Sequence, residues 1–235
     1  EQFEHLDGRS LRYCIDETDA DGQWPARYQR AILPYSLLDE THLLGSATKG
    51  NRKLGLIDLD PPPHFDLVIV DEAHHARNPA TWRHRAVQYF CDNAEAVIFL
   101  SATPIQLGNA DLFNLLRLLR PDLIQDRGDF ERMAKPNQHT GLAAKQARAG
   151  GPEWQALAIE SVDRALETEW GSAVMAGDVS VQGVLDLLKS PQDDASRIEI
   201  IRRLEELNSF SSLINRTRRR DIGEFTTRKP RTIEI

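Results

Sequence analysis

Two short apolar runs stand out in the hydrophobic pattern of the chain. Phe65–Val70 and Ala96–Leu100 are rich in β-branched residues, have the length of strands, and are apolar on both faces. Such runs are typical of a parallel sheet that is covered on both sides. Between them, the pattern predicts a helix from about Pro79 to Phe90. Strand, helix and strand within about 35 residues form a βαβ unit, so we expect a parallel sheet.

Other elements follow from the same pattern and from turn residues. Apolar residues spaced three and four apart predict a helix between Asn109, its expected N-cap, and Pro121, which ends it. Upstream, we expect a short strand at Leu11–Ile15, a strand that ends near Pro34 and leads into a helix, and a loop over residues 45–63.

Beyond residue 125 the β-branched runs disappear. Residues 134–152, which are rich in Ala, Gly, Gln and Lys, are predicted to be a mobile loop. Glu199 and Arg203 are spaced to form an ion pair on a helix. Helical spacing also returns in three stretches, at residues 153–168, 181–188 and 198–207. We therefore expect a helical insertion over 126–210.

Composition and charge narrow the class of protein. The chain has 235 residues, of which 40% are hydrophobic and 28% charged, as in soluble proteins of about one and a half domains. Cys14 and Cys91 have no CxxC spacing, which predicts a reducing, cytoplasmic compartment. No apolar run approaches the ~18 residues of a membrane span, so no membrane partner is expected.

The net charge of −7 is unevenly distributed. Residues 214–235 hold seven basic and three acidic residues, a net charge of +4, so that residues 1–213 carry −11. An acidic net charge argues against a protein that binds nucleic acid through an overall basic surface. The basic tail is nevertheless able to make local contacts with DNA phosphates.

Two carboxylates follow the first apolar strand. Ligands of open parallel sheets bind beyond the carboxyl ends of the strands, and buried carboxylates there need a cation or a partner. Nucleotide hydrolysis is a reaction that needs such a pair, because Asp71 can hold Mg²⁺ through water while Glu72 polarises the attacking water. Two alternatives stay open: helix capping, and a zinc site with His74 and His75, although their order does not match His-Glu-x-x-His.

The second strand ends in Ser101-Ala102-Thr103, followed by Pro104. Small hydroxyl residues at that place can hydrogen-bond His74, whereas the alternative is an ordinary strand-to-helix turn. The two strand ends together resemble a known family. Asp71-Glu72-Ala73-His74 resembles the Walker B motif, or DEAH box, of superfamily 2 helicases, and Ser101–Thr103 resembles their motif III.

A longer stretch resembles one branch of that superfamily. Leu100–Gln106 and Asp111–Leu116, up to Pro121, are similar to Swi/Snf-type ATPases, particularly bacterial ones. Arg30–Leu38 is similar to that branch's motif Ib, which touches the DNA backbone. The resemblance implies DNA contacts for Tyr35 and Ser36. Asn215–Asp221 is similar to a further Arg-rich segment of that branch. Its arginines either contact DNA phosphates, form a hinge to the second lobe, or are a solvated charge run; they are Arg216, Arg218, Arg219 and Arg220.

The resemblance implies an ATP-driven motor on double-stranded DNA that uses ATP and Mg²⁺. It implies a three-layer, parallel-sheet RecA-like lobe (a P-loop NTPase fold), incomplete over 1–125, with the helical insertion over 126–210 and a basic segment over 211–235 leading to a second lobe. It assigns Asp71 to Mg²⁺ and Glu72 to the hydrolytic water. It also implies that a further set of residues couples the nucleotide state to DNA binding: His74, Ser101, Ala102, Thr103 and Gln106.

The chain departs from this family in two motifs. It has no phosphate loop of the form G-x-x-x-x-G-K-[ST], since Gly45–Gly50 is followed by Asn51 and Arg52, and no Q-x-x-G-R-x-x-R motif. We therefore expect a fragment that starts at Glu1 and is inactive alone. The partners that it lacks are the phosphate-loop segment and the second lobe, and other proteins are further candidate partners. The alternatives are a degenerate, non-catalytic lobe that acts as a DNA- or protein-binding scaffold, and an RNA helicase of the DEAH type.

Overall fold

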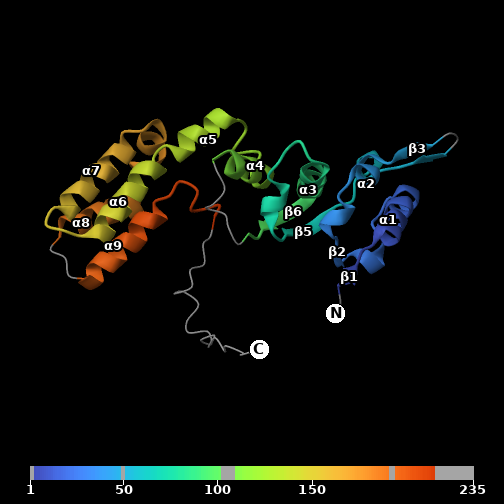
Figure 1. Cartoon of the computed structure of the whole chain (residues 1–235), viewed down its shortest axis with the longest axis horizontal. Coiled ribbons are helices and arrows are strands. Elements are labelled where there is room, and N and C mark those ends of the chain that lie inside the picture. Colours follow the sequence, from blue (N-terminus) through green and yellow to red (C-terminus); the bar gives the residue numbers. More distant parts are fainter. Residues whose placement is uncertain (1–2, 49–50, 102–108, 191–193, 215–235) are drawn as a thin grey trace, which may run out of the picture. The chain divides into compact units, whose positions relative to one another are not determined.

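The computed structural model describes residues 3–48, 51–101, 109–190 and 194–214. The chain divides into two units, Glu1–Arg127 and Gly128–Ile235. The first unit is mixed α/β with small sheets, and the second is helical (Figure 1). No helix in the described ranges has both the length and the apolar character that crossing a membrane demands.

Over its described residues, the first unit contains three two-stranded sheets. The pairs β1–β2 and β5–β6 are parallel, and β3–β4 is an antiparallel hairpin. The elements in chain order are β1 (Glu4–His5), α1 (Gly8–Asp21), η1 (Ala26–Tyr28), β2 (Ala31–Ile32), η2 (Tyr35–Leu37), α2 (Glu40–Leu44), β3 (Ser46–Thr48), β4 (Asn51–Lys53), η3 (Leu56–Asp58), β5 (Phe65–Val70), η4 (Ala73–Ala76), α3 (Trp82–Asp92), β6 (Ala94–Phe99) and α4 (Asn109–Leu119).

The βαβ unit predicted from the sequence is confirmed. Strands β5 and β6 run parallel, in a register that pairs Leu67 with Ala96 and Ile69 with Ile98, and α3 connects them. One face of this sheet packs onto the core of the unit through alternate residues, which meet side chains of α3 and α4. The sheet residues on that face are Val68, Val70, Val97 and Phe99.

The opposite face of β5–β6 differs from the prediction. Leu67, Ile69, Ile98 and Leu100 are each 45–57% exposed. The expectation that both strands are covered on both faces is therefore wrong for the described residues. A continuous apolar run specifies a strand, but its burial depends on whether helices pack on each side of the sheet.

The segment 11–15 is a helix rather than the predicted strand. Asp7 caps α1, because its Oδ1 accepts hydrogen bonds from the backbone N–H of Arg9 and Ser10, at 3.0 and 2.8 Å. Polar residues between the apolar ones hide the helical period. That period is carried by the buried residues Leu11, Cys14, Ile15 and Thr18.

The predicted loop over 45–63 contains a hairpin and a short helix. Strands β3 and β4 pair within it, and η3 follows. The base of the hairpin requires glycine, because a Cβ at Gly45 would collide with the carbonyl oxygen of Lys53. Gly45 also has a φ of 76°, where side chains are strained. A Cβ at Gly55 would meet the backbone of residues 43–45 in the same way.

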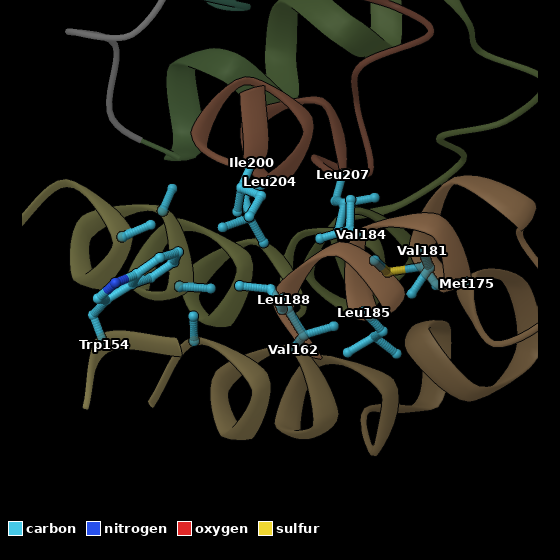
Figure 2. Close-up of a cluster of buried hydrophobic side chains, with 14 residues drawn as sticks. Trp154, Val162, Met175, Val181, Val184, Leu185, Leu188, Ile200, Leu204 and Leu207 are labelled. Carbon is cyan, nitrogen blue, oxygen red and sulfur yellow. The ribbon is translucent and has the colours of Figure 1, made fainter. Parts of the chain in front are cut away.

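The second unit is a group of packed helices with one apolar core (Figure 2). Its labelled side chains, including Val162, Leu188, Ile200 and Leu204, converge from α7, α8 and α9. The elements are α5 (Arg127–Ala134), which begins at the end of the first unit, α6 (Asn137–Ala149), α7 (Trp154–Leu166), the π-helix η5 (Gly171–Met175), α8 (Val179–Lys189) and α9 (Asp194–Glu206).

Helices α7, α8 and α9 confirm the three helical stretches, and α6 corrects the predicted loop over 134–152. Ala143, Ala144 and Ala147 are buried in α6, where small side chains let neighbouring helices approach closely. Alanine is also the strongest helix former, and this outweighs the glycines in the segment. On α9, the predicted ion pair is present, with Arg203 Nε 2.7 Å from Glu199 Oε1.

Candidate functional site

The carboxyl ends of β5 and β6 are joined by backbone hydrogen bonds. The N–H of Leu100 donates to the carbonyl oxygen of Val70, and the N–H of Ala73 donates to the carbonyl oxygen of Leu100, both at 2.9 Å. The two strand ends therefore lie side by side. The turn at Asp71–His74 lies beside the start of the second predicted motif, Ser101.

The turn after β5 has an unusual backbone. Glu72 has φ 47° and ψ 47° and, within the described ranges, is the one residue other than glycine with positive φ. This left-handed conformation costs a residue with a side chain about 1–2 kcal/mol. The N–H of Glu72 donates to Oδ1 of Asp71 at 2.8 Å. Strain of this kind persists only where surrounding contacts hold it, and it clusters at functional sites.

The side chains of Glu72 and His74 lie together. Oε2 of Glu72 is 3.2 Å from Nδ1 of His74, which forms an ion pair when the ring is protonated. Both atoms are shielded from solvent, and neither has a partner in good hydrogen-bond geometry among the described residues. A shielded carboxylate oxygen of this kind calls for a further polar group, such as a water molecule.

Tyr35 reaches this turn from a segment 36 residues away in sequence. Its hydroxyl donates to the carbonyl oxygen of Asp71 at 2.8 Å. The ring meets His75 edge-on at 5.6 Å, and the guanidinium of Arg83 lies 5.3 Å from the ring centroid. Burial raises the pKa of Tyr35 to about 12, so the hydroxyl stays a donor near neutral pH.

Hydrogen bonds and an ion pair join the segment after the turn to α3 and α4. His84 Nδ1 lies 2.6 Å from the carbonyl oxygen of Ala76, inside the unit. Asn114 Nδ2 donates to the carbonyl oxygen of Arg77 at 2.9 Å, and Arg77 Nε is 3.5 Å from Asp111. These contacts fix the carboxyl end of the turn, so both helices support its geometry.

The structure brings together four residues that the sequence analysis singles out: Tyr35, Asp71, Glu72 and His74. Ser36 is exposed on η2, and Ser101 is partly buried next to Leu100. The remaining candidates lie outside the described residues, namely Ala102, Thr103, Gln106, Arg216, Arg218, Arg219 and Arg220.

Three supporting residues are missed by the sequence analysis. Arg83, His84 and Asn114 contact the turn or the ring of Tyr35. Their helical spacing within α3 and α4 carries no signal, because the partners are backbone carbonyl groups or a ring distant in sequence. For Tyr35 the sequence gives a DNA-facing assignment, whereas the structure places its hydroxyl on the backbone of Asp71.

No three His, Cys, Asp or Glu side chains converge as metal ligands in the part of the chain that the structure describes. The zinc alternative requires such a convergence of Asp71, Glu72, His74 and His75. A magnesium ion does not, because it keeps most of its waters and takes one or two carboxylates.

Residues 62–150 match the SNF2-related domain family. The match begins just before β5 and runs through β6, α4 and α6, so it contains the whole Asp71–His74 turn. This stretch is similar to the SNF2-related domain, which supports the predicted resemblance to Swi/Snf-type helicase-related ATPases. ATPases of that family generally use ATP with Mg²⁺.

Proposed function

We propose that the Asp71–His74 turn is the Walker B element, a DEAH box, of a RecA-like lobe in an ATP-dependent motor on double-stranded DNA. The observation that carries this proposal is the solvent-shielded Oε2 of Glu72, which has no well-aligned hydrogen bond among the described residues and lies at the joined ends of two parallel strands. This is where open α/β sheets bind their ligands. The SNF2-related domain match supports the same class of activity.

The donor chemistry of the turn fits magnesium. Oδ1 of Asp71 is occupied by the N–H of Glu72 at 2.8 Å, and the carboxylate retains lone pairs for a water of hydration. Hard oxygen ligands with retained waters are what Mg²⁺ prefers. When bound beside a nucleotide, the ion neutralises phosphate charge. Asp71 would hold it through water.

Glu72 would orient and polarise the attacking water. Its Oε2 faces His74 at 3.2 Å, which limits the rotamers of the carboxylate. The second oxygen leaves the carboxylate free to accept a hydrogen bond from water. His74 would then sense the position of Glu72, in keeping with a coupling role.

The phosphates would have no cradle in this chain alone. The sequence lacks the phosphate loop, whose Lys and backbone N–H groups neutralise the β- and γ-phosphates. We therefore expect the isolated 235-residue chain to show no DNA-stimulated ATP hydrolysis. Turnover by this chain that Glu72→Gln abolishes would contradict that expectation.

DNA contacts would come from exposed Ser36 and from the basic tail. The tail carries a net charge of +4 over 214–235, and phosphate contacts release counterions, which makes affinity salt-dependent. Duplex affinity should fall steeply between roughly 50 and 200 mM salt. Affinity that does not change over this range would argue against phosphate contacts.

The decisive comparison uses the natural gene product. Its ATP hydrolysis should rise with duplex DNA and respond less to RNA of the same length. Stimulation by RNA instead would favour a DEAH-type RNA helicase. No hydrolysis under any of these conditions would favour a non-catalytic scaffold that binds DNA or protein.

A further inference from the structure

The peptide group between Asp71 and Glu72 is held at both of its polar atoms. Its carbonyl oxygen accepts a hydrogen bond from the hydroxyl of Tyr35, and its N–H donates to Oδ1 of Asp71, both at 2.8 Å. Fixing both atoms fixes the plane of the peptide, and with it the left-handed φ of Glu72. The next peptide N–H, that of Ala73, is held by Leu100 at 2.9 Å.

Of these three hydrogen bonds, only the one from Tyr35 comes from outside the two strand ends. Its ring is itself fixed, by an edge-on contact with His75 at 5.6 Å and by Arg83 at 5.3 Å from the centroid. A partly buried hydroxyl on a fixed ring aims its hydrogen bond in one direction. Tyr35 also stands on η2, next to exposed Ser36.

We propose that Tyr35 is a positioning residue for the hydrolytic carboxylate: its hydroxyl holds the Asp71–Glu72 peptide plane, and this sets the direction in which the side chain of Glu72 leaves the turn. The proposal rests on the function proposed above. It assigns to Tyr35 an action through Glu72 in place of the direct DNA contact that the family resemblance implies.

The test compares Tyr35→Phe with wild type in the natural gene product. Phenylalanine keeps the ring between His75 and Arg83 and removes only the hydroxyl. Tyr89→Phe is the matched control, since the Tyr89 hydroxyl is buried and has no hydrogen-bond partner among the described residues. Removing that hydroxyl should leave hydrolysis unchanged, because no bond is lost.

We expect Tyr35→Phe to lower kcat for ATP hydrolysis at saturating DNA by about two- to tenfold, the range of one neutral hydrogen bond. KM for ATP and Kd for duplex DNA should stay within about twofold. In the 235-residue chain, amide exchange at Glu72 should quicken by a similar factor, and exchange in Tyr89→Phe should not.

Three results would overturn the proposal or its basis separately. A normal kcat in Tyr35→Phe, with Glu72→Gln inactive, would refute the positioning role and leave the proposed function intact. A raised Kd for DNA with an unchanged kcat would assign Tyr35 to DNA. Normal hydrolysis by Glu72→Gln would refute the proposed function itself, whatever Tyr35→Phe does.

Discussion

The backbone N–H of Ala73 donates a hydrogen bond to the carbonyl oxygen of Leu100 at 2.9 Å. This bond links the turn that carries the acidic pair to the end of the neighbouring strand. It also explains how Glu72 keeps a left-handed backbone, since the residue after it has a fixed place. The acidic turn and the start of the second motif therefore form one structural piece.

Replacing Glu72 with glycine should stabilise the first unit. Glycine adopts positive φ without the steric cost of about 1–2 kcal/mol that a side chain brings. It also loses about 0.5–1 kcal/mol more chain entropy on folding, which offsets part of this gain. The free energy of unfolding should therefore rise by about 0.5–1 kcal/mol. The matched variant Glu72→Gln keeps the Cβ and should change stability by less than about 0.5 kcal/mol. Urea unfolding of the three proteins measures this, and a less stable glycine variant would contradict the strain at Glu72.

Both thiols should be unreactive in the folded chain. Burial raises the pKa of Cys14 and of Cys91 to about 12 each, so both stay protonated at pH 8. Iodoacetamide should modify them only after unfolding.

The same shifts predict a loss of stability at high pH. The pKa of an exposed thiol is 9.0, so the unfolded chain releases its thiol protons at a lower pH than the folded chain does. The contribution of the thiols is thus complete below about pH 9 and declines as pH rises toward about 12. Unfolding of a Cys14→Ala variant should lose part of this dependence; an identical pH profile would contradict it.

The core of the second unit offers a matched pair on one helix. Ile200 is 0% exposed in the cluster of Figure 2, and Ile198 on the same helix is 65% exposed. Ile200→Ala should destabilise the unit by about 2–5 kcal/mol, and Ile198→Ala by less than about 0.5 kcal/mol. Amide exchange in α6 to α9 measures both, and equal effects would place the core elsewhere.

Two glycines should respond to alanine in opposite directions. At Gly141, in the interior of α6, an added Cβ meets nothing within 4 Å, so Gly141→Ala should stabilise by about 0.5–1 kcal/mol. At Gly45 the added Cβ collides with the backbone of Lys53, and φ is 76°. Gly45→Ala should therefore destabilise. Thermal unfolding of each variant measures its effect, and Gly45→Ala tests the close backbone contact at the base of the hairpin.

Sequence reasoning succeeds here where a signal is local and strong. The runs at Phe65–Val70 and Ala96–Leu100 locate both strands within two residues of their bounds, and the acidic pair follows directly. It fails where polar residues hide the helical period, as in α1, or where small residues carry it, as in α6. There, a cap at Asp7 and buried alanines decide the structure, and neither shows in a hydrophobic profile.

The position of the two carboxylates at the end of β5 can be predicted from the sequence, but the contacts that support them cannot. Asp71 and Glu72 follow from strand and chemistry, whereas the left-handed backbone of Glu72 has no local signature such as glycine. The contact from Tyr35 spans 36 residues and ends on a carbonyl group, which every residue has. Contacts of this kind depend on tertiary packing, so one sequence cannot specify them.

The central claim is that Glu72 activates the attacking water, and its most direct test is Glu72→Gln in the natural gene product. Glutamine keeps the size of the side chain and loses the charge. The variant should bind ATP with Mg²⁺ as tightly as wild type, within about twofold, while DNA-stimulated hydrolysis falls by at least about 10²-fold. Hydrolysis at the wild-type rate would show that the turn after β5 is not the hydrolytic element.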